Sequence, residues 1–292
     1  MKFFTYDISS ISPVKLCIIP MVILVISLVS VGLVMMQTGL PIHPGIEFQG
    51  GISVTIVTDD TPEEIEAYFS GYPLIAVEQG INNGKYLKFG PMDDQNTIEF
   101  TKKVEEKYTG AKIDQIGSSF GKTLQDQAIF ALLISFIGMA IVVFLIFRTF
   151  VPSAAIVLSA FADMVMTAGA MNLLGYELSL GTTAALLMLI GYSVDSDILL
   201  TSRVLKRKGK FDEKIQGAYR TGIIMTSTAF AAALAMWIAS EIGGIQIISE
   251  IASVILIGLV FDIMNTWLTN AGIIKWYMTE GKGRLSSSQR GA

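Results

Sequence analysis

Long apolar runs separated by short polar segments dominate the hydropathy pattern of this chain. Six of them reach the roughly 20 residues that a helix needs to cross a bilayer core, at about 14–37, 126–147, 152–174, 178–202, 220–240 and 248–276. The first run is too long for a signal peptide and has no small-residue cleavage site, so we expect it to be retained as a helix. The pattern predicts a polytopic α-helical membrane protein with six transmembrane helices.

One long segment, residues 39–125, interrupts the apolar pattern and is typical of a small water-soluble domain. It holds 13 acidic residues and 7 lysines. Thr61 and Glu64 form a capping box that starts a helix, with Pro62 at its first position. The predicted elements are, in order, a strand over 52–58, a helix over 61–71, strands over 73–79 and 85–89, a helix over 94–108 and a strand over 112–118. This β-α-β-β-α-β order predicts an extracytoplasmic α+β domain of the ferredoxin-like kind between helices 1 and 2.

Among the termini and short loops, lysine and arginine are confined to alternate ones, and this sets the expected orientation; the length of the segment 39–125 exempts it from the rule. The loops near 175–177 and 241–244 hold none. The basic positions at the termini and in the other short loops are Lys2, Lys15, Arg148, Arg203, Lys206, Arg207, Lys208, Lys210, Lys214, Lys275, Lys282, Arg284 and Arg290. By the positive-inside rule, both termini are expected in the cytoplasm of a cell in whose plasma membrane the protein lies. The predicted organisation is an N-terminus and first helix (1–38), an outer domain (39–125), a five-helix bundle (126–277) and a cytoplasmic tail (278–292).

Composition excludes several classes of protein. Hydrophobic residues make up 52% of the chain and charged residues 16%, against about a quarter charged in typical soluble domains. The net charge of −4 does not fit a nucleic-acid binder, so no nucleic-acid partner is expected. With one cysteine, Cys17, and one histidine, His43, the chain has too few residues for a disulfide or a His/Cys metal cluster. We expect no cofactor and no metal.

Two motifs are set aside. The segment 117–123 ends in Gly-Lys-Thr like a phosphate-binding loop, but Ile116 occupies the position where that loop needs its first glycine. The basic cluster from Arg203 to Lys214 could bind anionic lipid or nucleic acid. A cytoplasmic loop whose positive charges set the membrane orientation is the simpler interpretation.

Acidic residues inside the apolar runs are the informative chemistry. Asp163, Asp195, Asp197 and Asp262 each carry an insertion cost of at least about 2.5–3.5 kcal/mol, so they need a partner or a wet cavity. Asp195 and Asp197 are two residues apart, about 200° around a helix, and cannot face the same partner. We expect one of them to meet Arg220, at the inner start of the fifth run. A structural role for these acids within the bundle stays open.

Small and hydroxyl-bearing residues accompany these acids at helical spacing. Asp262 shares a helix face with Asn265, Thr266 and Thr269, which favours a neighbour other than lipid. On the fifth run, Thr226 belongs to a stripe of small residues suited to close helix packing.

Three stretches resemble a known family. They are Gly45-Ile46-Glu47-Phe48-Gln49-Gly50-Gly51 after the first run, Gly191-Tyr192-Ser193-Val194-Asp195-Ser196-Asp197 leading to Arg203, and Arg220-Thr221 followed by Thr226-Ser227-Thr228. Together they resemble the SecD/SecF family of the resistance-nodulation-division superfamily, and within it the archaeal SecF proteins. Bacterial members usually have Asn-Asp in the fourth span, whereas here Asp195 and Asp197 flank Ser196.

The resemblance implies a non-enzymatic accessory subunit of the Sec protein translocase. Its implied partners are a SecD-like membrane subunit, the Sec translocation channel and unfolded secretory chains, and its implied drive is the proton gradient. The implied proton relay is Asp195, Asp197 and Arg220, with Asp195 preferred for its motif position. Supporting polar residues in the membrane are Asp163, Arg203, Asp262, Asn265, Thr226 and Ser227, and the outer-domain motif is Gly45, Glu47, Phe48, Gly50 and Gly51.

Two alternatives are weaker. An exporter of small molecules or lipids from the same superfamily usually has larger outer domains and both halves in one chain. An intramembrane aspartyl protease needs a Gly-x-Gly-Asp motif, and the segment 191–195 lacks the second glycine in register.

Overall fold

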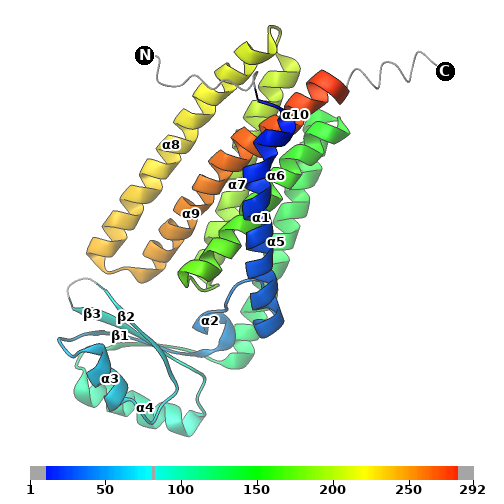
Figure 1. Cartoon of the computed structure of the whole chain (residues 1–292). Helices are drawn as coiled ribbons and strands as arrows, with labels where there is room; N and C mark the ends of the chain where they lie inside the picture. Colours follow the sequence, from blue (N-terminus) through cyan, green and yellow to red (C-terminus); the bar gives the residue numbers. More distant parts are fainter. Residues whose placement is uncertain (1–10, 81–82, 282–292) are drawn as a thin grey trace.

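The computed structural model describes residues 11–80 and 83–281, and it shows a helical bundle with a small sheet domain at one end (Figure 1). The six membrane-length helices are α1 (Pro13–Thr38), α5 (Ser118–Phe147), α6 (Phe150–Leu174), α7 (Leu180–Lys206), α8 (Phe211–Gly243) and a last span, Gln246–Thr279. The last span consists of α9 (Gln246–Met264), a π-helix η1 (Asn265–Asn270), α10 (Ala271–Trp276) and the start of a second π-helix, η2 (Tyr277–Gly281). The six predicted transmembrane helices are confirmed.

Two helices are longer than their apolar runs. Helix α5 begins at Ser118 rather than near 126, and α8 begins at Phe211 rather than near 220. Hydropathy marks only the part of a helix that meets the bilayer core, whereas the helix continues until a cap or breaker stops it. Asp212 and Glu213 in the first turn of α8 also favour its early start, because acidic side chains stabilise helix N-termini. The predicted tail beyond 281, with Lys282, Arg284 and Arg290, lies outside the described residues, as does Lys2.

Helices α6 and α7 form the centre of the bundle. More than half of the residues in their apolar windows are buried, against fewer than a fifth in α1, α5 and α8. Figure 1 shows α8 running along one side of the bundle beside α9. The outer helices therefore present most of their apolar side chains to lipid or to a partner.

The sheet domain lies between α1 and α5 and has the predicted element order. Its elements are β1 (Gly51–Val57), α3 (Pro62–Tyr68), β2 (Leu74–Gln79), β3 (Gly84–Phe89), α4 (Asp94–Lys107) and β4 (Lys112–Ile116). The strands pair antiparallel in the order β2-β3-β1-β4, which is the ferredoxin-like arrangement. The capping box at Thr61 and Glu64 is present. The α+β prediction is confirmed.

The two faces of this sheet have different chemistry. Because side chains alternate along a strand, Ile52, Val54 and Leu87 point to α3 and α4 and are buried there. Their neighbours Tyr86 and Lys88 point the other way and line cavities shared with the ends of α6, α8 and α9 nearest the sheet. The polar face of the sheet therefore faces the bundle, as Figure 1 shows.

Candidate functional site

Three aspartates meet in the middle of the bundle. Asp163 of α6 and Asp197 of α7 are fully buried, and Asp262 of α9 is 1% exposed. We call them the acid cluster. They act on one another electrostatically. The same membrane-length helices carry further buried hydroxyl and carboxamide side chains, namely Ser159, Thr167, Ser193, Ser196, Thr201, Asn265, Thr266, Thr269 and Asn270.

Asp163 is held by residues of two other helices. Ser193 Oγ of α7 donates a hydrogen bond to its Oδ2 at 2.5 Å, and Asn265 Nδ2 of η1 donates to its Oδ1 at 2.7 Å. Thr269 Oγ1 donates to the amide oxygen of Asn265 at 3.1 Å. Because the oxygen of the Asn265 amide accepts from Thr269, its nitrogen is the atom that faces Asp163. Only the nitrogen can donate to a carboxylate. The carboxylate therefore ties α6, α7 and the last span together.

Asp262 accepts as many side-chain hydrogen bonds as Asp163 does, whereas only one oxygen of Asp197 accepts one. Asp262 accepts hydrogen bonds from Ser196 Oγ at 3.3 Å and from Thr266 Oγ1 at 3.2 Å. Asp197 Oδ1 accepts one from Asn270 Nδ2 at 2.8 Å. Asp197 Oδ2 is buried without a hydrogen-bond partner among the described residues. A buried oxygen with a free lone pair is open to a proton or a water molecule.

The π-helix η1 explains how two asparagines of the last span can donate hydrogen bonds to two aspartates on other helices. Asn265 and Asn270 are five residues apart, which in an α-helix places them about 140° from each other. In a π-helix each residue bonds to the fifth along, so these two side chains return to the same side. Asn265 therefore reaches Asp163 while Asn270 reaches Asp197.

The acid cluster has no ion-pair partner within residues 11–80 and 83–281. Arg203 is used elsewhere, because its guanidinium donates to Gly217 O at 2.6 Å and to Thr221 Oγ1 at 2.9 Å. Arg220 is exposed. The ion pairs of the described chain all lie outside the acid cluster.

The predicted relay of Asp195, Asp197 and Arg220 is not assembled in this structure. Asp195 is exposed and lines an open cavity of about 440 Å³ between α7, α8 and α9, together with Thr226 and Asp262. The expected pairing of an aspartate with Arg220 is absent from the described contacts. Arg220 lies six residues before Thr226, which is about 9 Å along the axis of α8. It is therefore displaced along this helix from the cavity that Thr226 lines. Ser227, a neighbour of Thr226, is exposed.

The motif that begins at Gly45 forms a neck between the sheet domain and the bundle. Gly45 N donates to Leu178 O at 2.9 Å, and Leu178 N donates to His43 O at 2.7 Å. Glu47 accepts a hydrogen bond from Leu180 N at the start of α7. Phe48, in the short helix α2 (Ile46–Gln49), is buried in the bundle core. The neck is thus fastened to the loop between α6 and α7.

The two glycines that close this motif are required by the backbone. Gly50 has φ +81°, and a Cβ there would lie 2.6 Å from Ser118 Cα. Gly51 has φ +147°, and a Cβ there would collide with the carbonyl oxygen of Phe89. Side chains rarely adopt such φ values, so glycine is needed where β1 leaves the neck beside α5.

Sequence reasoning missed part of the site. It gave Asp163 and Asp262 only supporting roles, and it did not single out Ser193, Ser196 or Asn270 as partners of the acids. A signal for Asn270 was available, because a carboxamide inside a membrane span is costly unless it is bonded.

The chain is similar in sequence to known membrane proteins of one family. Residues 96–280 match the family described as protein export membrane protein SecD/SecF, C-terminal. The chain is 51% identical over 281 residues to the protein-export membrane protein SecF of Methanolacinia petrolearia, covering 96% of this chain and 99% of that protein. It is 41% identical to the SecF of Haloferax volcanii, covering 92% and 94%.

A solved structure has the same fold. The crystal structure of SecDF from Thermus thermophilus, described as a translocon-associated membrane protein, matches with a TM-score of 0.71 at 21% identity. The match covers 90% of this chain and 38% of that longer chain.

Proposed function

The chain belongs to the SecD/SecF family of protein-export membrane proteins and has the role of an accessory subunit of the Sec translocase, and we propose that the proton gradient drives it through the acid cluster. It is a multi-pass membrane protein of the Sec system. The proposal includes action on unfolded secretory chains as they leave the translocation channel. Movement of the outer domain is the proposed output.

The observation that carries this proposal is the burial of three carboxylates without a counter-charge. Asp163, Asp197 and Asp262 are buried, Asp262 at the edge of the open cavity, and within the described residues no lysine or arginine pairs with them. Like charges in a medium of low polarity repel strongly, so gain or loss of one proton changes the packing preference of all three helices. A bundle with two arrangements is then biased by the proton it holds.

Asp197 is the favoured site of proton exchange. Its Oδ2 has no hydrogen-bond partner among the described residues, whereas both oxygens of Asp163 and of Asp262 accept one. The hydroxyl groups of Ser159 and Thr266 lie beside this carboxylate, so a proton gained on Oδ2 has neighbouring oxygens to which it can be donated. This choice replaces the preference for Asp195, which rested on motif position.

The open cavity beside Asp195 supports a SecD-like partner. A carboxylate that faces outward at membrane depth is costly unless another protein or water covers it. Asp195, Thr226 and Thr228 line this cavity between α7, α8 and α9. A second six-helix bundle that offers hydrogen-bond donors at this level fits the cavity and completes a twelve-span unit.

We propose that both termini lie in the cytoplasm and that the sheet domain lies outside. Single cysteines at Lys102 and Gly243, in a chain with Cys17 replaced by alanine, should react with an impermeant maleimide in intact cells. A cysteine at Lys208 should react only after permeabilisation. Labelling of position 208 in intact cells would reverse the orientation.

The test of the proton drive is protein export into membrane vesicles with and without a proton gradient. Asp197→Asn should assemble with its partner but lose the gradient-dependent stimulation. Asp195→Asn, the same chemical change on the opposite face of α7, is the matched control and should retain most of it. If Asp197→Asn and the triple change of the acid cluster both keep full stimulation, the acids are structural. If deletion of the protein leaves export rates unchanged, the exporter alternative is favoured.

A further inference from the structure

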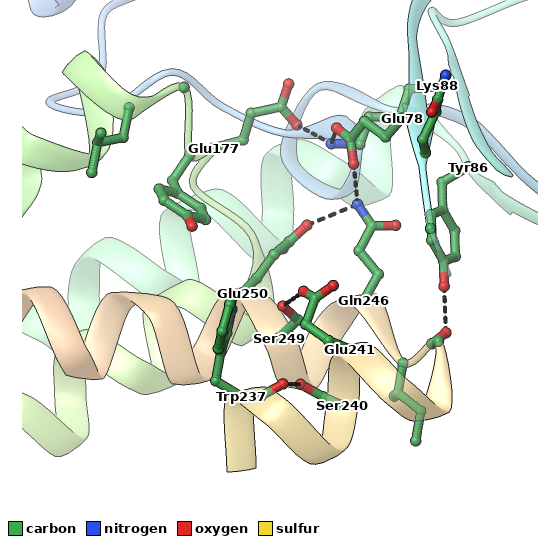
Figure 2. Close-up of a pocket in the computed structure, with 17 residues that line it drawn as sticks. Glu78, Tyr86, Lys88, Glu177, Trp237, Ser240, Glu241, Gln246, Ser249 and Glu250 are labelled. Atoms are coloured by element: carbon green, nitrogen blue, oxygen red, sulfur yellow. Dashed lines mark hydrogen bonds and ion pairs between the residues drawn. The ribbon is translucent and has the colours of Figure 1, made fainter. Parts of the chain in front are cut away.

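The outer domain touches the bundle at a second place, away from the neck. Lys88 on the polar face of the sheet reaches the loop between α6 and α7, and Glu78 beside it reaches the start of α9 (Figure 2). We call Glu78, Lys88, Glu177, Gln246 and Glu250 the clasp. It is a continuous set of contacts between elements that the chain does not join directly.

The contacts of the clasp centre on one ammonium group. Lys88 Nζ lies 2.6 Å from Glu78 Oε1 and 3.1 Å from Glu177 Oε2. The side-chain amide of Gln246 donates to Glu78 and, at 3.0 Å, to Glu250 Oε1. Figure 2 shows these side chains converging from the sheet and from the bundle. Lys88 is therefore the only cation among three clasp carboxylates.

The clasp needs the charge of Lys88. Burial to 9% exposure disfavours a charged lysine, but hydrogen bonds and attraction from Glu78 and Glu177 outweigh it and raise the pKa of Lys88 above its usual 10.5. Lys88 is therefore charged over the whole physiological range. Without it, Glu78 and Glu177 would face each other with no counter-charge, and their repulsion would push the sheet from the bundle.

The chemistry of the clasp allows the sheet domain to separate from the bundle at this contact. The clasp is polar, and its residues line two cavities, of about 390 Å³ and 440 Å³. Polar interfaces between parts of one chain allow relative motion more readily than apolar ones do. Charged groups that leave such an interface regain water, which offsets the loss of their bonds.

The clasp residues on the bundle side lie on, or next to, the helices that carry the acid cluster. Glu177 lies in the loop that joins α6, which carries Asp163, to α7, which carries Asp197. Gln246 and Glu250 lie in the first turns of α9, which carries Asp262. A shift among these three helices therefore moves the bundle side of the clasp.

We propose that Lys88 is a positioning residue whose contacts hold the outer domain on the bundle, and that opening of these contacts is the step by which helix movement releases the domain during export. This inference rests on the proposed function.

The first test measures the position of the domain. Spin labels at Ile98 on α4 and Ile242 on α8, both exposed, report the distance between the domain and the bundle in the full chain with Cys17 replaced. Lys88→Gln should broaden and lengthen the distance distribution. The matched control is Lys112→Gln, because Lys112 pairs with Asp114 within its own strand, and it should leave the distribution unchanged. An unchanged distribution in Lys88→Gln would overturn the inference.

The second test locks the clasp without altering it. Gln79 and Ile245 line the 390 Å³ cavity beside the clasp, and cysteines there can be joined by a bis-maleimide with a reducible centre. Joining should abolish export stimulation, and reduction of the linker should restore it in the same sample. A purely structural role of the clasp predicts full activity while joined, which would refute the inference.

The failure of the two proposals can be told apart. If locking blocks export while Asp197→Asn has no effect, the clasp stands and the proton relay fails. If Asp197→Asn blocks export while the locked protein stays active, the relay stands and the clasp is refuted.

Discussion

Replacement of Gly169 by alanine should separate α1 from α6. A Cβ added at Gly169 would lie 2.6 Å from Ser27 Cβ and 2.8 Å from Ser27 Cα. The latter atom belongs to the backbone of α1, so no change of side-chain rotamer removes the clash. The two helices must move apart by about 1 Å to restore ordinary van der Waals distances.

The magnitude follows from what holds membrane helices together. Inside a bilayer, helix pairing depends on close packing rather than on the hydrophobic effect. A gap of about 0.5–1 Å forfeits roughly a quarter to a half of the dispersion energy of each atom pair along the seam. Added methyl groups in packed cores cost about 1–3 kcal/mol, and we expect Gly169→Ala to fall in that range.

The assay is unfolding of the purified full chain in detergent, followed by circular dichroism during heating. Gly32→Ala on α1 is the control, because a Cβ there meets no atom within 4 Å. It should be neutral, or stabilising by up to about 1 kcal/mol, since alanine favours a helix more than glycine does. Adding Ser27→Gly to Gly169→Ala should recover only part of the loss, because the clash with the backbone of α1 remains. If Gly169→Ala is no more harmful than Gly32→Ala, the packing argument is wrong.

Other predictions concern the acid cluster, the outer domain and the neck. Asn270→Ala removes a donor to a buried carboxylate and should lower stability by about 0.6–1.7 kcal/mol in the same unfolding assay, whereas no change would contradict the bond. Hydrogen bonds from Lys107 and Tyr108 lower the pKa of Asp60, so its stabilisation is present above about pH 4 and is lost as the pH falls further. The difference in unfolding free energy between the wild type and Asp60→Asn should therefore shrink in acid, and a constant difference would refute this. Gly50→Ala combines a left-handed φ with a backbone clash and should cost about 2–4 kcal/mol, against about 1 for Gly39→Ala, which shares the φ but has free space.

The fold was predictable because its signals are local. An apolar run of sufficient length has few alternatives to a membrane helix, and the capping box at Thr61 and Glu64 marks a helix start from four adjacent residues. Alternation along 52–58 likewise predicts β1 directly. Helix ends beyond the bilayer were less certain, because α5 and α8 continue through polar residues that hydropathy does not count.

The site was less predictable because it depends on which side of a helix faces inward. Helix geometry correctly separates Asp195 from Asp197, but it does not choose between them, since only packing against α6 and η1 buries one face. The partnership of Asn270 with Asp197 was hidden by the π-helix, which changes the angular position of every residue after Asn265. Both features arise from interactions between residues distant in sequence.

The two chain connections to the outer domain converge on one corner of it, where Gly50 lies against Ser118 and Gly121 against α2. The chain therefore enters and leaves the domain at this one corner, its root, and the domain is supported elsewhere by the clasp and by the hydrogen bond that Tyr86 Oη donates to Gly244 O. Strand β1 has seven residues and extends about 20 Å from this root at roughly 3.3 Å per residue. Once the clasp opens, a tilt of about 20° at the root carries the far end of β1 through about 7 Å. In the proposed mechanism, a helix movement that opens the clasp would thereby produce a displacement of the domain comparable to the length of two residues of an extended polypeptide.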